Sequence, residues 1–313
     1  MDISGQYLVT LVLNGLLIGL IYALMALGLT LIFSVLGIVS FAHGEFYMLG
    51  GYVVYFALER FTNLSPIVAI LLAGIIPFLV GIIFERLFLQ PMARGEIERP
   101  GEYAILVTFG LSFFLQYLMA GIVGPFPKKA DRFFDLPTFD LGWIKATAST
   151  LTIGGIPFSA SRLTAGLIAM ILIGAMILFI KRSWTGKALQ AVSQDREAAA
   201  VTGINPLNMN TLAFGLGAML AGLSGATLVD VFAWVPWVGV QASSKSFVII
   251  VLGGMGSMPG ALLGGLIIGI VESLGAGLFP DPGRALAYKD AFGLLIFAAV
   301  LLLKPTGLFG REL

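Results

Sequence analysis

A few ionisable side chains lie within or beside the long apolar stretches of this 313-residue sequence. His43 and Glu45 occur together, Asp230 precedes an aromatic cluster, and Glu272 lies in a Gly-rich stretch. Ionisable groups at membrane depth are costly and usually face the protein interior or water. We therefore expect His43, Glu45 and Glu272 either to line a solute path or gate, or to stabilise helix ends and helix contacts. For Asp230 we expect a position at the membrane interface.

Other kinds of chemistry find little support in the residue types. The segment Gly222-Leu-Ser-Gly225 resembles the serine setting of intramembrane proteases, but a nucleophilic serine needs a base within reach. The only histidine is His43, far upstream, so helix packing is the simpler role for these glycines. A single histidine and no cysteine also predict no metal site, no disulfide and no thiolate catalysis.

The composition identifies the environment in which these residues must be positioned. Apolar residues make up 58% and charged residues 11% of the sequence, and the mean hydropathy is +0.99. A soluble domain averages about 45–50% apolar and about 25% charged residues. A polytopic, all-α membrane protein follows, and a soluble enzyme, a secreted disulfide scaffold and a nucleic-acid binder are excluded. The net charge of +1 also argues against a polyanionic partner.

The apolar stretches predict eight or nine transmembrane helices in a single domain, 1–313. They are long and continuous rather than alternating, as helices and not barrel strands require. The N-terminus lacks a basic region, so we expect its first apolar stretch to be a retained span. The 242–256 segment is short, and a re-entrant or broken helix is an alternative there. The predicted spans are 8–33, 42–61, 65–85, 103–124, 163–182, 208–233, 242–256, 259–279 and 288–304.

Basic residues near the span ends predict the orientation. With nine spans, the 86–102 loop, the 183–206 loop and the C-terminal tail lie on one face, which the positive-inside rule assigns to the cytoplasm. The N-terminus and the long 125–162 loop are then outside, although that loop also carries three basic residues. The cytoplasmic basic residues would be Arg86, Arg94, Arg99, Lys181, Arg182, Lys187, Arg196, Lys304 and Arg311.

Small residues are spaced for close helix packing. Gly15 and Gly19 form one pair four residues apart, Gly265 and Gly269 form another, and Gly256, Gly260 and Gly264 form a ladder. Such spacing lets helix backbones approach closely in lipid. The Gly-rich segments that begin at Asn14 and Phe214 are each followed by a polar break. This similarity indicates either an internal repeat of two related halves or only a shared composition.

The 183–206 loop is longer than a connection between spans requires. Asp195 followed by Glu197 and Ala198 predicts a short helix start, and Gly203 predicts its end. Connections between helices need about two to eight residues. We therefore expect one or two short amphipathic helices, either as a folded solvated loop or as a docking surface for a cytoplasmic partner.

Several segments resemble known permeases. Glu197-Ala-Ala-Ala-Val-Thr-Gly203 resembles the loop by which permeases of ATP-binding-cassette importers engage their ATPase. Four further segments resemble the branched-chain amino acid permeases, and most closely their LivH-type subunit. They begin with Asn14-Gly-Leu-Leu-Ile-Gly-Leu, Ser40-Phe-Ala-His-Gly-Glu, Val251-Leu-Gly-Gly-Met-Gly-Ser and Lys304-Pro-Thr-Gly-Leu-Phe-Gly310. The resemblance covers most of 1–124 and 163–313.

The resemblance implies an assembly and a localisation. Members of this family work with a second permease subunit, two cytoplasmic ATPases and an outer solute-binding protein, in the cytoplasmic (inner) membrane of bacteria or archaea. This sequence has no G-x-x-x-x-G-K-[ST] segment, so ATP and Mg would be bound by the partners and no cofactor by this chain.

The same resemblance implies a role for one loop and a choice of substrates. Asp195, Arg196, Glu197, Ala198, Ala199 and Gly203 would form the ATPase-coupling loop. The expected substrates are branched-chain amino acids moved by alternating access. Related importers carry urea, short amides or other amino acids, and composition alone also allows a passive channel or carrier.

Overall fold

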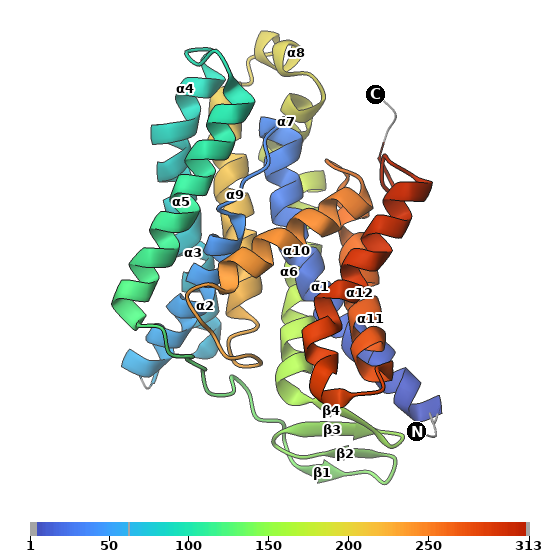
Figure 1. The fold of residues 1–313 in the computed structure, drawn as a ribbon. Coiled ribbons are helices and arrows are strands. Elements are labelled where there is room, and N and C mark those ends of the chain that lie inside the picture. The colour runs from blue at the N-terminus through green and yellow to red at the C-terminus, as the bar shows by residue number, and fades with distance from the viewer. Residues whose placement is uncertain (1–4, 62, 311–313) are drawn as a thin grey trace.

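The computed structural model describes residues 5–61 and 63–310 and consists mainly of helices packed side by side (Figure 1). In chain order the helical segments are α1 (Gly5–Leu36), α2 (His43–Arg60), α3 (Pro66–Phe84), the π-helical η1 (Glu85–Leu89), α4 (Gln90–Ala93), α5 (Pro100–Val123), α6 (Ala160–Arg182), α7 (Trp184–Gln194), α8 (Arg196–Val201), α9 (Pro206–Ala226), α10 (Val238–Gly253), α11 (Met258–Leu278) and α12 (Pro282–Leu303).

The bundle has two distinct ends. One end carries α4, α7, α8 and the C-terminal segment, and we call it the loop end (Figure 1). The opposite end carries the start of α1 and a small sheet, and we call it the sheet end. The three basic segments predicted to share one face therefore do lie together, except that Arg311 lies outside the described residues.

Within the described residues, six helical segments are long and apolar enough to cross a membrane. They are Gly5–Leu36, Pro66–Ala93, Pro100–Val123, Ala160–Arg182, Pro206–Ala226 and Met258–Leu278. The other predicted spans correspond to α2, α10 and the second half of α12. Helix α10 has only 16 residues, whereas α2 and α12 carry charged residues in their first or last turns. The chain is thus a polytopic helical membrane protein.

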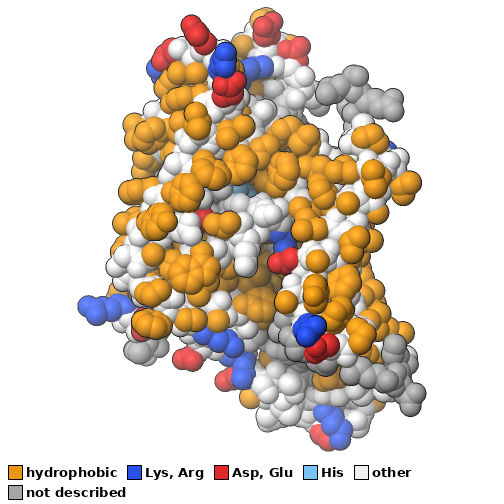
Figure 2. Space-filling model, viewed as in Figure 1, with side chains coloured by type: hydrophobic (Ala, Val, Ile, Leu, Met, Phe, Trp, Pro, Cys, Tyr) orange, Lys and Arg blue, Asp and Glu red, His pale blue; other side chains and the backbone are white. Residues whose placement is uncertain are grey.

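Burial follows the position of each helix in the bundle. Helices α1 and α9 are largely enclosed by the others, whereas α5 exposes large apolar side chains such as Leu106, Phe114 and Ile122. Figure 2 shows an apolar surface between two ends where acidic and basic side chains gather. This distribution matches a protein whose waist is surrounded by hydrocarbon and whose ends meet water.

Glycine pairs bring α1 and α11 into close contact, as the sequence predicts. A Cβ atom on Gly15 would lie 2.8 Å from the Gly269 carbonyl oxygen, and one on Gly19 would lie 3.1 Å from that of Gly265. Gly256 differs from the prediction, because it lies in the turn between α10 and α11 with φ of +82°. Its role is therefore a backbone conformation that L-residues rarely adopt.

The 125–162 loop contains a sheet that the all-helical prediction did not include. Strands β1 (Phe139–Asp140), β2 (Ile144–Ala146), β3 (Thr150–Ile153) and β4 (Ile156–Ser159) form an antiparallel meander in sequence order. The strands are short, so the alternation of apolar and polar residues along them is a weak signal in the sequence. The hydropathy of the neighbouring helices is a much stronger one.

Helix α9 ends seven residues before the predicted span does. Residues 227–233 are mostly apolar but form turns and irregular structure, because their backbone pairs with the outer loop. The Ala130 N–H donates to the Val229 carbonyl at 3.2 Å, and Lys128 and Trp234 exchange backbone hydrogen bonds. Asp230 is buried within this segment.

Candidate functional site

Two short helices, α7 and α8, fold the 183–206 segment at the loop end. The Ser183 hydroxyl accepts from the Gly186 N–H at 2.8 Å and starts α7. The Asp195 carboxylate accepts from the N–H groups of Glu197 and Ala198, both at 2.9 Å, and starts α8. Gly203 follows the end of α8 with φ of +88°. The predicted helix start and end are therefore confirmed: the Asp195 side chain caps the start, and the positive φ of Gly203 follows the end.

One side of α7 and α8 is anchored and the other is free. Leu189 and Val192 of α7 and Ala199 of α8 are buried against the bundle. Glu197 and Ala198 are exposed, and the Val201 side chain is 89% exposed. The exposed side of α7 and α8 is therefore free of contacts with the rest of the described bundle.

Polar contacts connect α8 to the interior. With its amide oriented to satisfy both neighbours, Asn210 of α9 accepts from Arg196 at 2.9 Å. At the next residue, the Thr211 hydroxyl donates to the buried carboxylate of Glu85 in η1 at 2.5 Å. Side-chain hydrogen bonds therefore link α8 to α9 and α9 to η1. Sequence reasoning missed Glu85, although a lone carboxylate at the end of an apolar run was a usable signal.

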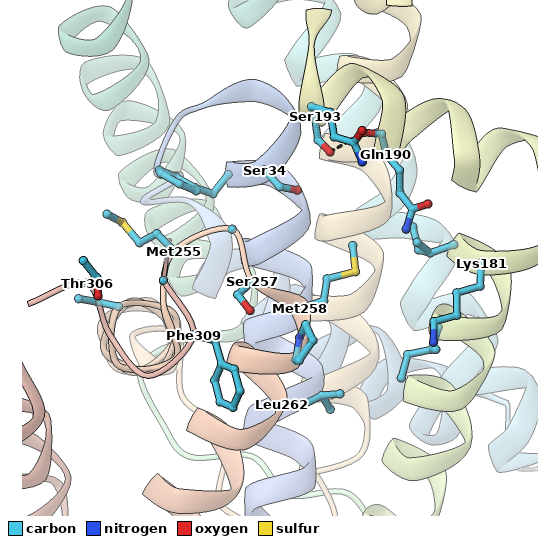
Figure 3. A pocket seen from close by; sticks show the side chains of 18 of the residues that line it. Ser34, Lys181, Gln190, Ser193, Met255, Ser257, Met258, Leu262, Thr306 and Phe309 are labelled. Atoms are coloured by element: carbon cyan, nitrogen blue, oxygen red, sulfur yellow. Dashed lines mark hydrogen bonds between the residues drawn. The ribbon is translucent and has the colours of Figure 1, made fainter. Parts of the chain in front are cut away.

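A cavity of about 1100 Å³, which we call the inner cavity, lies beside α7 at the loop end. Ser34 of α1, Lys181 of α6 and Gln190 of α7 contribute to its wall, and Met258 and Leu262 of α11 lie across from them (Figure 3). Because α7 forms part of this wall, a shift of α7 and α8 would change the shape of the cavity.

The C-terminal segment closes another side of the inner cavity. Its Leu308 and Phe309 N–H groups each donate at 2.9 Å, to the carbonyls of Leu252 and Gly253 at the end of α10. Thr306 and Phe309 lie on the cavity wall (Figure 3). Two of the sequence segments that resemble permeases, 251–265 and 304–310, are therefore in direct contact.

His43 and Glu45 are buried at the start of α2 but do not act as a pair. A ring nitrogen of His43, Nε2, lies 2.9 Å from the Met25 carbonyl oxygen, and Ser112 of α5 donates to the Glu45 carboxylate at 3.1 Å. Among the described residues, these two side chains share no hydrogen bond or ion pair. Because Met25 is in the middle of α1, α2 starts inside the bundle and not at the loop end.

The starts of α2 and α10 are in backbone contact. The Gly44 N–H donates to the Ser243 hydroxyl at 2.8 Å, and that hydroxyl donates to the Phe41 carbonyl at 3.0 Å. A Cβ atom on Gly44 would lie 1.9 Å from the Gly239 carbonyl oxygen, and one on Gly239 would lie 2.4 Å from the Glu45 carboxylate. A side chain at position 44 would therefore clash with the backbone of α10, and one at position 239 would displace the Glu45 carboxylate.

Glu272 belongs to a group of charged and polar side chains that joins four helices, and we call this group the Lys245 network. Lys245 of α10 lies 2.8 Å from Glu272 of α11 and 2.8 Å from Asp290 of α12. The Tyr22 hydroxyl of α1 donates to Glu272 at 3.1 Å, and Lys289 lies 3.4 Å from Glu272. The side chain of Glu272 is 2% exposed and that of Asp290 is 59% exposed, so the network runs from the interior to a surface.

Sequence reasoning missed most of the Lys245 network. Lys245 lies inside the predicted span 242–256, where a charge is a functional signal by itself. On the face shown in Figure 2, a basic and an acidic side chain lie together in a recess midway between the two ends.

Ser224 of the Gly222–Gly225 segment is buried and donates to the Leu220 carbonyl at 2.7 Å, as in a packed helix.

Known proteins similar to this chain are membrane permeases. A high-affinity branched-chain amino acid transport system permease protein, BraD of Pseudomonas aeruginosa, is 35% identical over 98% of this chain and 96% of its own length. The corresponding LivH of Salmonella typhimurium is 31% identical over 98% of both chains. The LivM permease of the same organism is 25% identical over 82% of this chain and 61% of its own length.

No solved structure matches the chain. Residues 11–303 match the family described as the branched-chain amino acid transport system permease component. This match covers all of the helices from α1 to α12 except the first turns of α1. The chain therefore belongs to the family of permease components of branched-chain amino acid transport systems.

Proposed function

We propose that this chain is a permease subunit of an ATP-driven importer that moves branched-chain amino acids across the cytoplasmic (inner) membrane by alternating access. Its full-length similarity to BraD and LivH supports the substrate class. The observation that carries the proposal is the capped, anchored and partly exposed α7–α8 element, because a passive channel needs no such element.

We further propose that the chain has nine spans with the loop end in the cytoplasm. Helices α2, α10 and α12 would be the spans added to the six apolar ones. In this arrangement the basic loops at the loop end follow the positive-inside rule, and the sheet end faces outward. The order of a long helix, a break and a shorter helix occurs in both α1–α2 and α9–α10, which supports an internal repeat.

Movement of α7 and α8 would be the step that couples ATP hydrolysis to transport. Asp195, Arg196, Glu197, Ala198, Ala199 and Gly203 form this coupling element, and Arg196 transmits its displacement to α9 through Asn210. The inner cavity would change at the same time, because α7 is part of its wall. In this mechanism, the side chains of His43, Glu45 and Glu272 would hold in position the helices that line or gate the path of the substrate.

The proposed partners follow from the same family. A second permease of the LivM kind would complete the membrane part, two ATPases would bind ATP and Mg at the loop end, and a solute-binding protein would deliver substrate at the sheet end. The similarity to both LivH and LivM supports a membrane part built from two related chains.

Purification of the tagged chain from its native membrane tests this function. We expect a second permease and ATPase subunits to copurify, and proteoliposomes of the complex to accumulate leucine only with ATP and binding protein. Urea, acetamide and other amino acids serve as competitors that define the substrate. Recovery of the chain alone, with solute flux in the absence of ATP, would contradict the proposal.

A further inference from the structure

A second cavity, which we call the outer cavity, lies among α1, α6, α11 and α12. Its volume is about 350 Å³, and much of its wall is apolar. Sites for small molecules are concave and mostly apolar, with a few placed polar groups, and span about 300–1,000 Å³. The outer cavity has the size of a site for a small metabolite. The apolar side chains used in the argument below are those of Leu11, Ile18, Phe232 and Phe279.

One positive group in the outer cavity forms no ion pair with any described residue. Arg162, at the start of α6, lines the cavity and donates to the Asn14 amide oxygen at 3.4 Å. Among the residues that the structure describes, no carboxylate lies within ion-pair distance of its guanidinium group. A partly buried guanidinium with free donors is suited to bind a carboxylate with two parallel hydrogen bonds.

A negative group lines the same cavity. Glu272 contributes to the wall, together with Lys289, whose ammonium group lies 3.4 Å from the Glu272 carboxylate. That contact is longer than the 2.8 Å between Glu272 and Lys245. An incoming ammonium group would have to replace Lys289 beside Glu272, while Lys245 and Tyr22 keep their contacts with that carboxylate. Arg162 and Glu272 come from different helices, so the cavity offers opposite charges on separate parts of its wall.

We propose that the outer cavity binds a free α-amino acid with an apolar side chain, as a station that the substrate occupies on its way through the membrane. Arg162 would hold the carboxylate, Glu272 would hold the ammonium group in place of Lys289, and Ile18 and Phe232 would contact the side chain. This inference rests on the proposed importer function, because it names the residues of this chain that contact the substrate.

The absence of cysteine makes a direct test available. Ala276 lines the outer cavity and is half-buried, so Ala276→Cys places a single thiol on its wall. Ser149→Cys places a single thiol on the exposed part of the sheet end as the matched control. The rate of reaction with a small polar methanethiosulfonate is measured on each purified membrane complex, without added binding protein, at increasing leucine concentration.

Leucine is expected to slow the labelling of Ala276→Cys and to leave Ser149→Cys unchanged. Leucinol, which lacks the carboxylate, and 4-methylpentanoate, which lacks the ammonium group, should protect far less. Adding Arg162→Gln should raise the half-protecting leucine concentration by about tenfold or more, and Arg162→Lys should restore part of the protection. Labelling of both thiols without leucine shows that the reagent reaches both positions.

Three results would overturn the inference. The first is that leucine leaves the labelling rate of Ala276→Cys unchanged, and the second is that Arg162→Gln does not weaken the protection by leucine. The third is that 4-methylpentanoate protects as well as leucine does, which would make the outer cavity an anion site. ATP-dependent leucine uptake by the same Cys-containing complexes separates the two proposals. Uptake without protection defeats only the outer cavity as a station, whereas no uptake by the unmodified complex defeats the importer function itself.

Discussion

Glu197 and Gly203 are the residues at which the proposed coupling can be tested most directly. Glu197 is exposed on α8, and Gly203 has φ of +88°, which proline cannot adopt. We expect Glu197→Lys or Gly203→Pro to reduce leucine uptake by about tenfold or more while ATP hydrolysis continues, because coupling free energies are about 1–3 kcal/mol. Uptake and phosphate release are measured on the same proteoliposomes.

The control for this prediction is Glu98→Lys. Glu98 is also an exposed carboxylate at the loop end, but it lies between α4 and α5. We expect uptake by this variant to stay near that of the unmodified complex. Normal uptake by both Glu197→Lys and Gly203→Pro would remove the coupling role from α8.

Residues whose partners are close in sequence could be predicted, and residues with distant partners could not. Asp195 and Gly203 were assigned correctly because a helix cap needs only N–H and carbonyl groups within a few residues. His43 and Glu45 were recognised as unusual, but their contacts come from Met25 and Ser112 on other helices. The roles of His43, Glu45 and Glu272 in a path or gate stay predictions.

Among the elements, the junction of α2 and α10 leaves little room for change. A Cβ atom on Gly44 would meet the Gly239 carbonyl oxygen at 1.9 Å, and a backbone atom cannot move aside as a side chain can. We expect Gly44→Ala to destabilise the folded chain by at least about 1–3 kcal/mol, as overpacking does. The thermal midpoint of the detergent-solubilised complex, followed by fluorescence-detected gel filtration, measures the effect.

Gly121→Ala on α5 is the matched control. A Cβ atom there would meet nothing within 4 Å, so the substitution adds helix propensity without a clash. We expect Gly121→Ala to leave the thermal midpoint unchanged or raise it, since alanine is favoured over glycine in a helix by about 0.5–1 kcal/mol. Equal midpoints for the two variants would show that the junction is looser than its geometry indicates.

The existence of most helices could be predicted from the sequence, but the residues at which they end were harder to predict. Hydropathy locates a helix that must cross hydrocarbon, since nothing but internal hydrogen bonds can satisfy its backbone there. The end of α9 depends instead on Lys128 and Ala130, which are about 100 residues upstream and pair with its apolar continuation. The sheet in the 125–162 loop was missed because its strands have two to four residues each.

For the whole molecule, the nine-span arrangement makes a prediction about sidedness. We expect an impermeant maleimide to label Asn63→Cys and Ser149→Cys in intact cells, and Glu98→Cys and Ser193→Cys only after permeabilisation. All four positions are exposed, and each variant carries a single thiol. Labelling of Asn63→Cys from the cytoplasmic side would show that α2 returns without crossing.

The Lys245 network also bears on what drives the molecule. Its two ammonium groups, of Lys245 and Lys289, are matched by the carboxylates of Glu272 and Asp290. Moving one elementary charge through the membrane potential involves about 2.3 kcal/mol per 100 mV. A network that shifts as a unit carries no net charge and therefore performs no electrical work. Membrane voltage would neither assist nor oppose such a step.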